Sequence, residues 1–140
     1  MATDISTINI KASPERVWDT ITNPNLVKLW QYGSDVISNW KVGQDIRFKT
    51  LWEDQVFEQW GKLLAIKPHE LLRYSLFAPR PGFEDKPGNY FEMNYVLTSE
   101  KNETKLVILQ IDNRPGAVPE EPQGDENPVL QLLKKTAEAF

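Results

Sequence analysis

The chain has 140 residues, 40% of them hydrophobic, and a formal net charge of −4. This length is enough for one domain with one sizeable core, and we expect residues 1–140 to form a single domain. The chain has no cysteine, which excludes disulfides, a thiol nucleophile, a zinc finger and an iron–sulfur site.

Charge and hydropathy also exclude two kinds of partner. The 16 Lys and Arg residues are scattered along the chain, so no basic patch predicts binding to nucleic acid. No apolar run approaches the roughly 20 residues of a membrane span. The first residues, MATDISTINI, lack the basic-then-apolar order of a signal peptide. We therefore expect a cytoplasmic protein without a membrane span.

Turn signals divide the chain into short segments with alternating apolar residues, which is typical of antiparallel strands. The first predicted strand covers residues 4–11. Two short helices follow it, because Ser13 and Asn23 can each cap a helix that begins with a proline, Pro14 or Pro24. Six more strands are predicted at residues 36–40, 45–52, 56–66, 71–77, 90–99 and 105–112.

The last predicted element is an amphipathic helix that begins at Pro128, after a proline-rich surface loop at residues 113–128. Its apolar residues recur at three-to-four spacing and are Val129, Leu130, Leu133, Ala137 and Phe140. One such helix can cover the inner face of the sheet only if the sheet curves around it. The elements therefore predict an α+β fold with a curved antiparallel sheet of about six to seven strands wrapped around a C-terminal helix.

Four stretches of the sequence carry a resemblance to a known superfamily. They are IKASPERVWDTITNPNLVKLW at residues 10–30, VGQDIRFK at 42–49, GKLLAIKPHELLRYSL at 61–76 and NYVLTSEKNETKLVILQ at 94–110. In these stretches the chain resembles the START-like (SRPBCC) superfamily with its helix-grip, pollen-allergen-like fold. Within it, the chain is similar to the group related to the C-terminal domain of the heat-shock ATPase activators. Gln44 and Gln110 depart from the pattern, which often has glycine and histidine there.

The resemblance and the supply of aromatic residues imply a cavity between the sheet and the C-terminal helix, closed by the two short helices. The expected cavity walls are Trp30, Phe48, Trp52, Tyr74, Met93, Tyr95 and Leu133, with Gln110 as the polar contact. Thr50 is a second polar residue on an otherwise apolar strand face. The alternative is a filled core, in which Trp52 or Trp60 occupies the space.

Two further expectations concern single aromatic residues. Trp18, on the first short helix, is expected to be a buried core residue. The long connection at residues 78–89 has Phe83 as the one large apolar residue at its tip. This connection is either a variable surface loop or a lid over the cavity.

The sequence has no clear catalytic or metal-binding set of residues. The only histidine, His69, lies in a predicted turn and is expected to be exposed, which disfavours serine–histidine–acid catalysis. The acidic residues of the loop at 113–128 lack the spacing of a calcium loop. We predict no catalytic residue, no metal and no cofactor. The residues left for acid–base chemistry, as in the polyketide cyclases that share this fold, are Glu58, Tyr74, Glu92 and Tyr95.

Three functions stay open at this level, because a fold alone does not supply an activity. The first is binding of a hydrophobic or aromatic small molecule without catalysis. The second is a protein-interaction module, co-chaperone-like or linked to stress responses. The third is a cyclase or lyase that acts on an aromatic or polyketide-like substrate. We expect the first, in a monomer or a homodimer.

Overall fold

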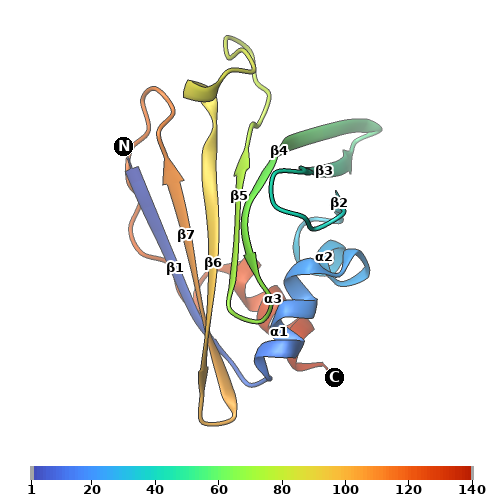
Figure 1. Ribbon diagram of the computed structural model, residues 1–140, viewed down its shortest axis with the longest axis vertical. Coiled ribbons are helices and arrows are strands. Elements are labelled where there is room, and N and C mark those ends of the chain that lie inside the picture. Colours follow the sequence, from blue (N-terminus) through green and yellow to red (C-terminus); the bar gives the residue numbers. More distant parts are fainter. Residues whose placement is uncertain (1, 140) are drawn as a thin grey trace.

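The computed structural model describes residues 2–139, which form three α-helices, one short 3-10 helix and one seven-stranded sheet (Figure 1). The strands are β1 (Ala2–Ile10), β2 (Asp35–Ser38), β3 (Asp45–Trp52), β4 (Gln55–Lys67), β5 (Leu71–Leu76), β6 (Phe91–Glu100) and β7 (Glu103–Asp112). The helices are α1 (Pro14–Thr22), α2 (Pro24–Trp30), α3 (Pro128–Glu138) and the 3-10 helix η1 (Pro87–Asn89). Among residues 2–139, no helix has both the length and the apolar character that crossing a bilayer requires.

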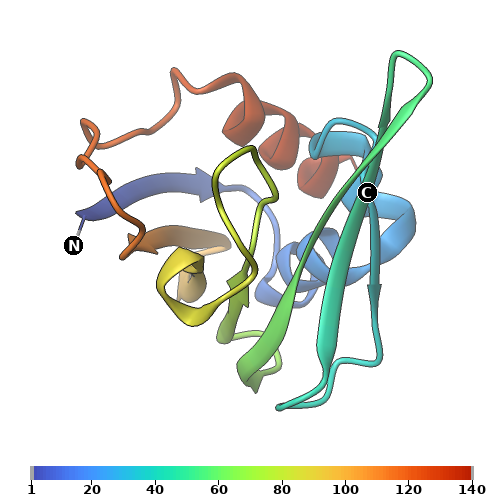
Figure 2. The same cartoon turned by 90° about the horizontal axis from the view of Figure 1, so that it is seen from above.

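The sheet is antiparallel throughout and has the order β1-β7-β6-β5-β4-β3-β2. It curves around α3, with α1 and α2 beside α3 (Figures 1 and 2). Leu133 and Ala137 of α3 are fully buried in one cluster with Ile8, Ile10 and Leu106 from the sheet. The predicted α+β helix-grip fold is therefore confirmed.

Capping side chains start all three α-helices, as the sequence pattern predicts for the first two. The Ser13 hydroxyl accepts from the Arg16 N–H, and the Asn23 side chain accepts from the Asn25 N–H. The side chain of Asn127 accepts from the N–H groups of the first turn of α3. Arg16 then joins two helices, because its guanidinium donates to the carbonyl oxygens of Thr136 and Ala137 in the last turn of α3.

The loop before α3 covers one edge of the sheet. The Thr7 N–H donates to the Gln123 carbonyl at 2.9 Å, and the Gln123 N–H donates to the Ile5 carbonyl at 2.8 Å. The Asp4 carboxylate accepts from the Glu120 N–H at 2.8 Å. The predicted surface loop thus also satisfies backbone groups of β1, which an uncovered edge strand would expose to pairing with other chains.

Strand β4 changes partners at Gly61. From Leu63 onward β4 pairs with β5, whereas residues 55–59 pair with β3 alone and Trp60 forms one isolated bridge with Phe77. A Cβ atom on Gly61 would lie 1.8 Å from the Ser75 carbonyl oxygen. Glycine therefore permits the close approach of β5 at this point.

Some sequence-based details differ in the structure. The first strand begins at Ala2, before the predicted residue 4. Trp18 is only partly buried and contacts the exposed His69 edge-on, with 6.2 Å between ring centroids. The buried face of α1 carries Val17, Thr20 and Ile21, and Trp18 points about 100° away from Val17 around the helix. Trp18 does pack against the core cluster, so the expectation of a buried core residue holds only in part. The predicted helix residue Phe140 lies outside the described residues.

We expect Gly61→Ala to lower the free energy of unfolding by about 3 kcal/mol, the upper end of the usual range for overpacking. The added methyl group can be accommodated only if the backbone of β5 moves away from β4. Urea denaturation measures this change. Gly88→Ala is the matched control, because a Cβ there has no atom within 4 Å. Equal stability of the two variants would contradict the close approach at Gly61.

We expect the free energy of unfolding to depend more on Trp30 than on Trp18. Trp30 is buried and its indole N–H is hydrogen-bonded, so Trp30→Ala should cost about 3–5 kcal/mol of unfolding free energy. Trp18→Ala should cost clearly less, since part of its ring is already in water. Thermal and urea denaturation of both variants test this order, and the reverse order would contradict it.

Candidate functional site

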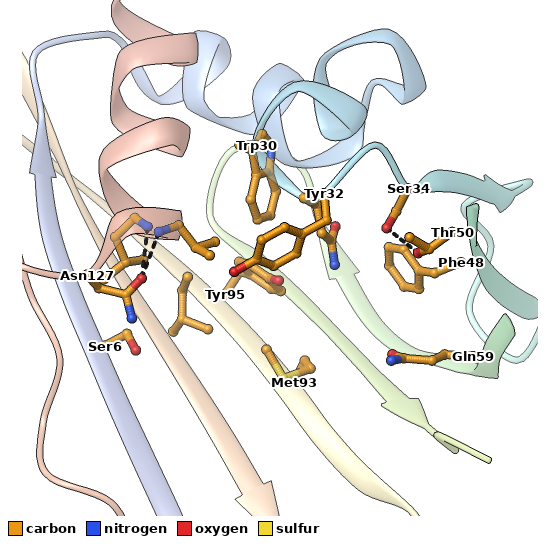
Figure 3. Close-up of a pocket in the computed structure, with 14 residues that line it drawn as sticks. Ser6, Trp30, Tyr32, Ser34, Phe48, Thr50, Gln59, Met93, Tyr95 and Asn127 are labelled. Atoms are coloured by element: carbon orange, nitrogen blue, oxygen red, sulfur yellow. Dashed lines mark hydrogen bonds between the residues drawn. The ribbon is translucent and has the colours of Figure 1, made fainter. Parts of the chain in front are cut away.

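A cavity of 410 Å³ lies between the concave face of the sheet, α2 and the first turn of α3 (Figure 3). Its apolar walls are Trp30, Tyr32, Phe48, Met93, Tyr95, Ile108, Val129 and Leu130. Its polar lining residues are Ser6, Gln31, Ser34, Thr50, Gln59 and Asn127. None of these 14 side chains carries a formal charge.

The period-two alternation of the strands brings the sheet residues of the cavity together. Phe48 and Thr50 on β3 and Met93 and Tyr95 on β6 each stand two residues apart, so each pair faces one side of the sheet. Tyr95 is directly opposite Ile108 of β7 in the antiparallel register. The floor of the cavity therefore includes alternate residues of β3 and β6 and the residue of β7 that pairs with Tyr95.

Trp30 forms a fixed wall because it ends α2 and is held by α1. Its indole nitrogen Nε1 donates to the Thr20 carbonyl oxygen at 2.9 Å, and its side chain is buried. Asn23 connects the two helices, since its backbone N–H caps the end of α1 while its side chain caps the start of α2. The tryptophan thus has its polar atom satisfied by the protein and presents only ring carbon to the cavity.

Two tyrosines lie one behind the other at the cavity floor. The hydroxyl oxygens of Tyr74 and Tyr95 are 3.3 Å apart and their rings stack with centroids 6.0 Å apart. Burial raises the pKa of both phenols, and that of Tyr74 is raised further by the nearby Tyr95 hydroxyl. Both side chains are therefore neutral at physiological pH, and Tyr95 offers the cavity a hydroxyl group rather than a charge.

Polar groups gather at the side of the cavity toward β2 and β3. The hydroxyls of Ser34 and Thr50 share a hydrogen bond of 2.6 Å, which ties the segment after α2 to β3. Gln59, cross-strand from Phe48, lines the same side. Figure 3 shows the Tyr32 side chain pointing across the cavity from this segment, although the ring is 71% exposed. Tyr32 therefore stands at the mouth of the cavity.

The structure brings four of the eight predicted site residues together at the cavity, namely Trp30, Phe48, Met93 and Tyr95. Tyr74 and Leu133 are buried in the core behind the walls. Gln110 lies in an adjoining hollow of 320 Å³, which shares Ser6, Met93, Ile108 and Asn127 with the cavity and also contains Asp4 and Glu120. Whether any of these residues contacts a ligand stays a prediction.

Trp52 is not a wall of the cavity, and the inward burial expected for it was wrong. It stands on the same face of β3 as Phe48 and Thr50, but it is 60% exposed because β3 extends past the end of β2. Trp60 does not fill the cavity either: its ring packs on Phe77, with 5.4 Å between centroids, and its indole N–H donates to Asp85. Phe83 lies under the Arg80 guanidinium, 4.0 Å away, and is not among the lining residues.

The two carboxylates considered for acid–base chemistry lie on the outer face of the sheet. Glu58 is within 3.5 Å of Arg47 and 3.4 Å of Lys49, and Glu92 is 3.0 Å from Arg73. Neither carboxylate lines the cavity. Among residues 2–139 there is also no group of three or more His, Asp or Glu side chains arranged to hold a metal ion.

Sequence reasoning missed several lining residues, for different reasons. Tyr32 and Ser34 lie in the short segment between α2 and β2, where no periodicity predicts a direction for the side chain. Gln59 is at an inward position in the alternation of β4, but a polar residue at such a position does not by itself indicate a cavity. The capping pattern Asn127–Pro128 was the one available signal for Asn127, which stands where α3 begins.

The two tyrosines generate a prediction for alkaline pH. The pKa values of both phenols are raised in the folded protein, so unfolding releases protons above the ordinary tyrosine pKa of about 10. The stabilising effect of the two phenols is therefore present below pH 10 and is lost as pH rises. Tyr74→Phe should therefore make the unfolding free energy fall less steeply between about pH 9 and pH 12 than in the wild type. Urea denaturation across this range measures the slope. Identical slopes would show that the Tyr74 phenol ionises as easily in the folded protein as in the unfolded chain.

Comparison with known structures supports this architecture. Protein ChR145 from Cytophaga hutchinsonii matches with a TM-score of 0.65 and 32% identity over 80% of this chain and 78% of that chain. The Aha1 dimer from Colwellia psychrerythraea matches with a TM-score of 0.70 and 20% identity over 99% and 97% of the two chains. Protein NE0264 from Nitrosomonas europaea matches with a TM-score of 0.76 and 15% identity over 99% and 95%. The last two likenesses show the fold alone.

A search of the curated proteins finds no match. The model of a protein family, described as "Activator of Hsp90 ATPase homolog 1-like protein", matches residues 11–137. This match covers nearly the whole chain and includes all the elements that build the cavity except the first strand. The chain therefore belongs to the Activator of Hsp90 ATPase homolog 1-like family, within the START-like superfamily that its sequence resembles.

Proposed function

We propose that the chain binds a neutral hydrophobic or aromatic small molecule in the 410 Å³ cavity, without changing it chemically. The observation that carries the proposal is the lining of the cavity, with eight apolar residues and no charged one. Cavities of this size, mostly apolar with a few polar groups, are typical of small-molecule sites. A ligand there would gain apolar contact with Trp30, Phe48 and Tyr95 and polar contact with Ser34, Thr50 and Gln59.

The electrostatics of the cavity favour a ligand without charge. An ion placed between these walls would lose hydration without gaining a counter-charge. The first turn of α3 does not offer an alternative anion site, because Asn127 already accepts from the N–H groups of Val129 and Leu130. Gln110 would contact only the part of a ligand that extends into the adjoining hollow.

Protein interaction is the second candidate, and a specific observation favours it. Leu51 and Val56 are both exposed on the outer face of the β3–β4 hairpin, and neither lines the 410 Å³ cavity. The family description names an ATPase activator, and one similar structure is described as a dimer. Cyclase or lyase chemistry has less support, since Glu58 and Glu92 are paired with cations on the outer face. The cytoplasmic location stays a prediction.

Binding of naphthalene carboxamide and of naphthoate tests the small-molecule function. The two compounds have similar shapes, but only naphthoate is charged. The carboxamide should raise the melting temperature, equivalent to about 2.7 kcal/mol at a hundredfold excess over Kd, and should change tryptophan emission because Trp30 is a wall. Naphthoate should bind at least about tenfold more weakly, since its charge would be buried without a partner.

The control variant is Met93→Trp, which places a larger side chain inside the cavity. It should abolish the thermal shift while the protein stays folded. Native mass spectrometry of the protein purified from its own host would identify a natural ligand directly. Absence of any shift with neutral apolar compounds, together with equal behaviour of wild type and Met93→Trp, would refute the proposal.

A further inference from the structure

The distal part of the β3–β4 hairpin, residues 50–59, is a two-stranded ribbon that projects from the body of the protein (Figure 2). On one side β2 ends its pairing at Asp35↔Lys49, and on the other β5 begins its continuous pairing at Leu63. Glu53 and Asp54 form the tight turn, both with positive φ, as in a two-residue hairpin loop. We call this ribbon the distal hairpin.

Large apolar side chains are exposed on the distal hairpin. Their exposed fractions are 68% for Leu51, 60% for Trp52, 64% for Val56 and 52% for Phe57. A two-stranded ribbon in water has little stability of its own, and exposed aromatic surface in a cluster is a mark of a binding site. These side chains therefore call for a function rather than a role in the core.

The two faces of the distal hairpin differ in what they adjoin. Trp52 follows Phe48 and Thr50 on the inner face of β3, and Phe57 is directly opposite Thr50. Phe48 and Thr50 line the cavity, and Trp52 lies beyond its wall on the same face, about 7 Å further along the strand than Thr50. Leu51 and Val56 face each other on the opposite side, in line with Lys49 and Glu58.

Tyr32 lies at the mouth of the cavity, in the segment between α2 and β2. Its φ of 52° is a backbone conformation that a bulky side chain rarely adopts, and its ring is 71% exposed while it lines the cavity. Backbone strain of this kind is common at sites that hold ligands. The Ser34–Thr50 hydrogen bond fixes the segment of Tyr32 to the base of the distal hairpin.

We propose that Tyr32, Trp52 and Phe57 form an outer aromatic subsite of the same binding site. The subsite takes the part of an elongated, neutral aromatic ligand that extends beyond the cavity. This inference rests on the proposed function and specifies the ligand class: a molecule longer than the cavity, with one end enclosed and the other held between exposed aromatic rings.

Two other occupants fit the distal hairpin less well. Glu53 and Asp54 form the very tip of the hairpin and bring two negative charges ahead of the apolar side chains. A lipid bilayer would have to accept these charges first, which is unfavourable. A protein partner would use Leu51 and Val56 as much as Trp52 and Phe57. Continuity with the cavity and the position of Tyr32 single out the inner face alone.

Binding of diphenylhexatriene, which is long and neutral, and of naphthalene carboxamide, which is short, tests the subsite. Replacing Trp52 and Phe57 together by serine should weaken diphenylhexatriene about tenfold or more, because two aromatic contacts are lost. The affinity for naphthalene carboxamide should stay within about twofold, because the cavity itself is intact. Fluorescence titration measures both affinities.

The matched control replaces Leu51 and Val56 by serine, which removes equally exposed apolar groups from the opposite face. It should leave both affinities unchanged. Tyr32→Gly is an independent variant: glycine suits a positive φ, so stability should hold or rise while diphenylhexatriene binds more weakly. A purely structural role of Tyr32 would not give this combination.

The outcomes separate this inference from the proposed function. If no neutral apolar compound binds the wild type, naphthalene carboxamide and diphenylhexatriene included, the proposed function fails and the subsite with it. If the carboxamide binds but diphenylhexatriene binds wild type and the Trp52/Phe57 variant alike, only the outer subsite is refuted. Sedimentation tests a third outcome. If the wild type is a dimer and both double variants abolish the dimer equally, the distal hairpin is a protein contact instead.

Discussion

One short helix has to cover the inner face of a seven-stranded sheet, and most of the structure follows from this constraint. α3 has 11 residues, and its buried side chains cluster toward Leu133 and Ala137, where they meet Ile8, Ile10 and Leu106. The sheet must therefore curve strongly, and α1 and α2 must fill the open side. Around the first turn of α3 the cover is incomplete, and the cavity lies there.

The same constraint divides the molecule into a part that is packed and a part that is open. Arg16 ties α1 to the last turn of α3, and Trp30 ties α2 to α1, so the helices form one unit against the sheet. β4 passes close to β5 at Gly61 and forms its last bridge to that side at Trp60, so residues 55–59 pair with β3 alone. The distal hairpin follows from this change of partners, since beyond residue 49 no third strand among residues 2–139 supports it.

Charge follows the same division. Arg47, Lys49 and Glu58 interact on the outer face, as do Arg73 and Glu92. Exposed pairs of this kind add little to stability. Their importance is that each carboxylate on these strands is directed away from the cavity by the alternation of the strand, so the cavity lining has hydroxyl, amide, aromatic and aliphatic groups but no charged side chain.

Local patterns in the sequence were sufficient for the elements and placed four of the eight predicted site residues at the cavity, and the limits of these patterns explain the rest. Capping residues located α1 and α2, and alternation located Phe48, Met93 and Tyr95. Alternation gives the face of a strand but not how far the sheet body extends, and this is why Trp52 has the inner face without the burial. Tyr32 lies in an irregular segment that no period describes. Because the cavity mouth is built where regular elements end, its residues are those that sequence periodicity is least able to assign.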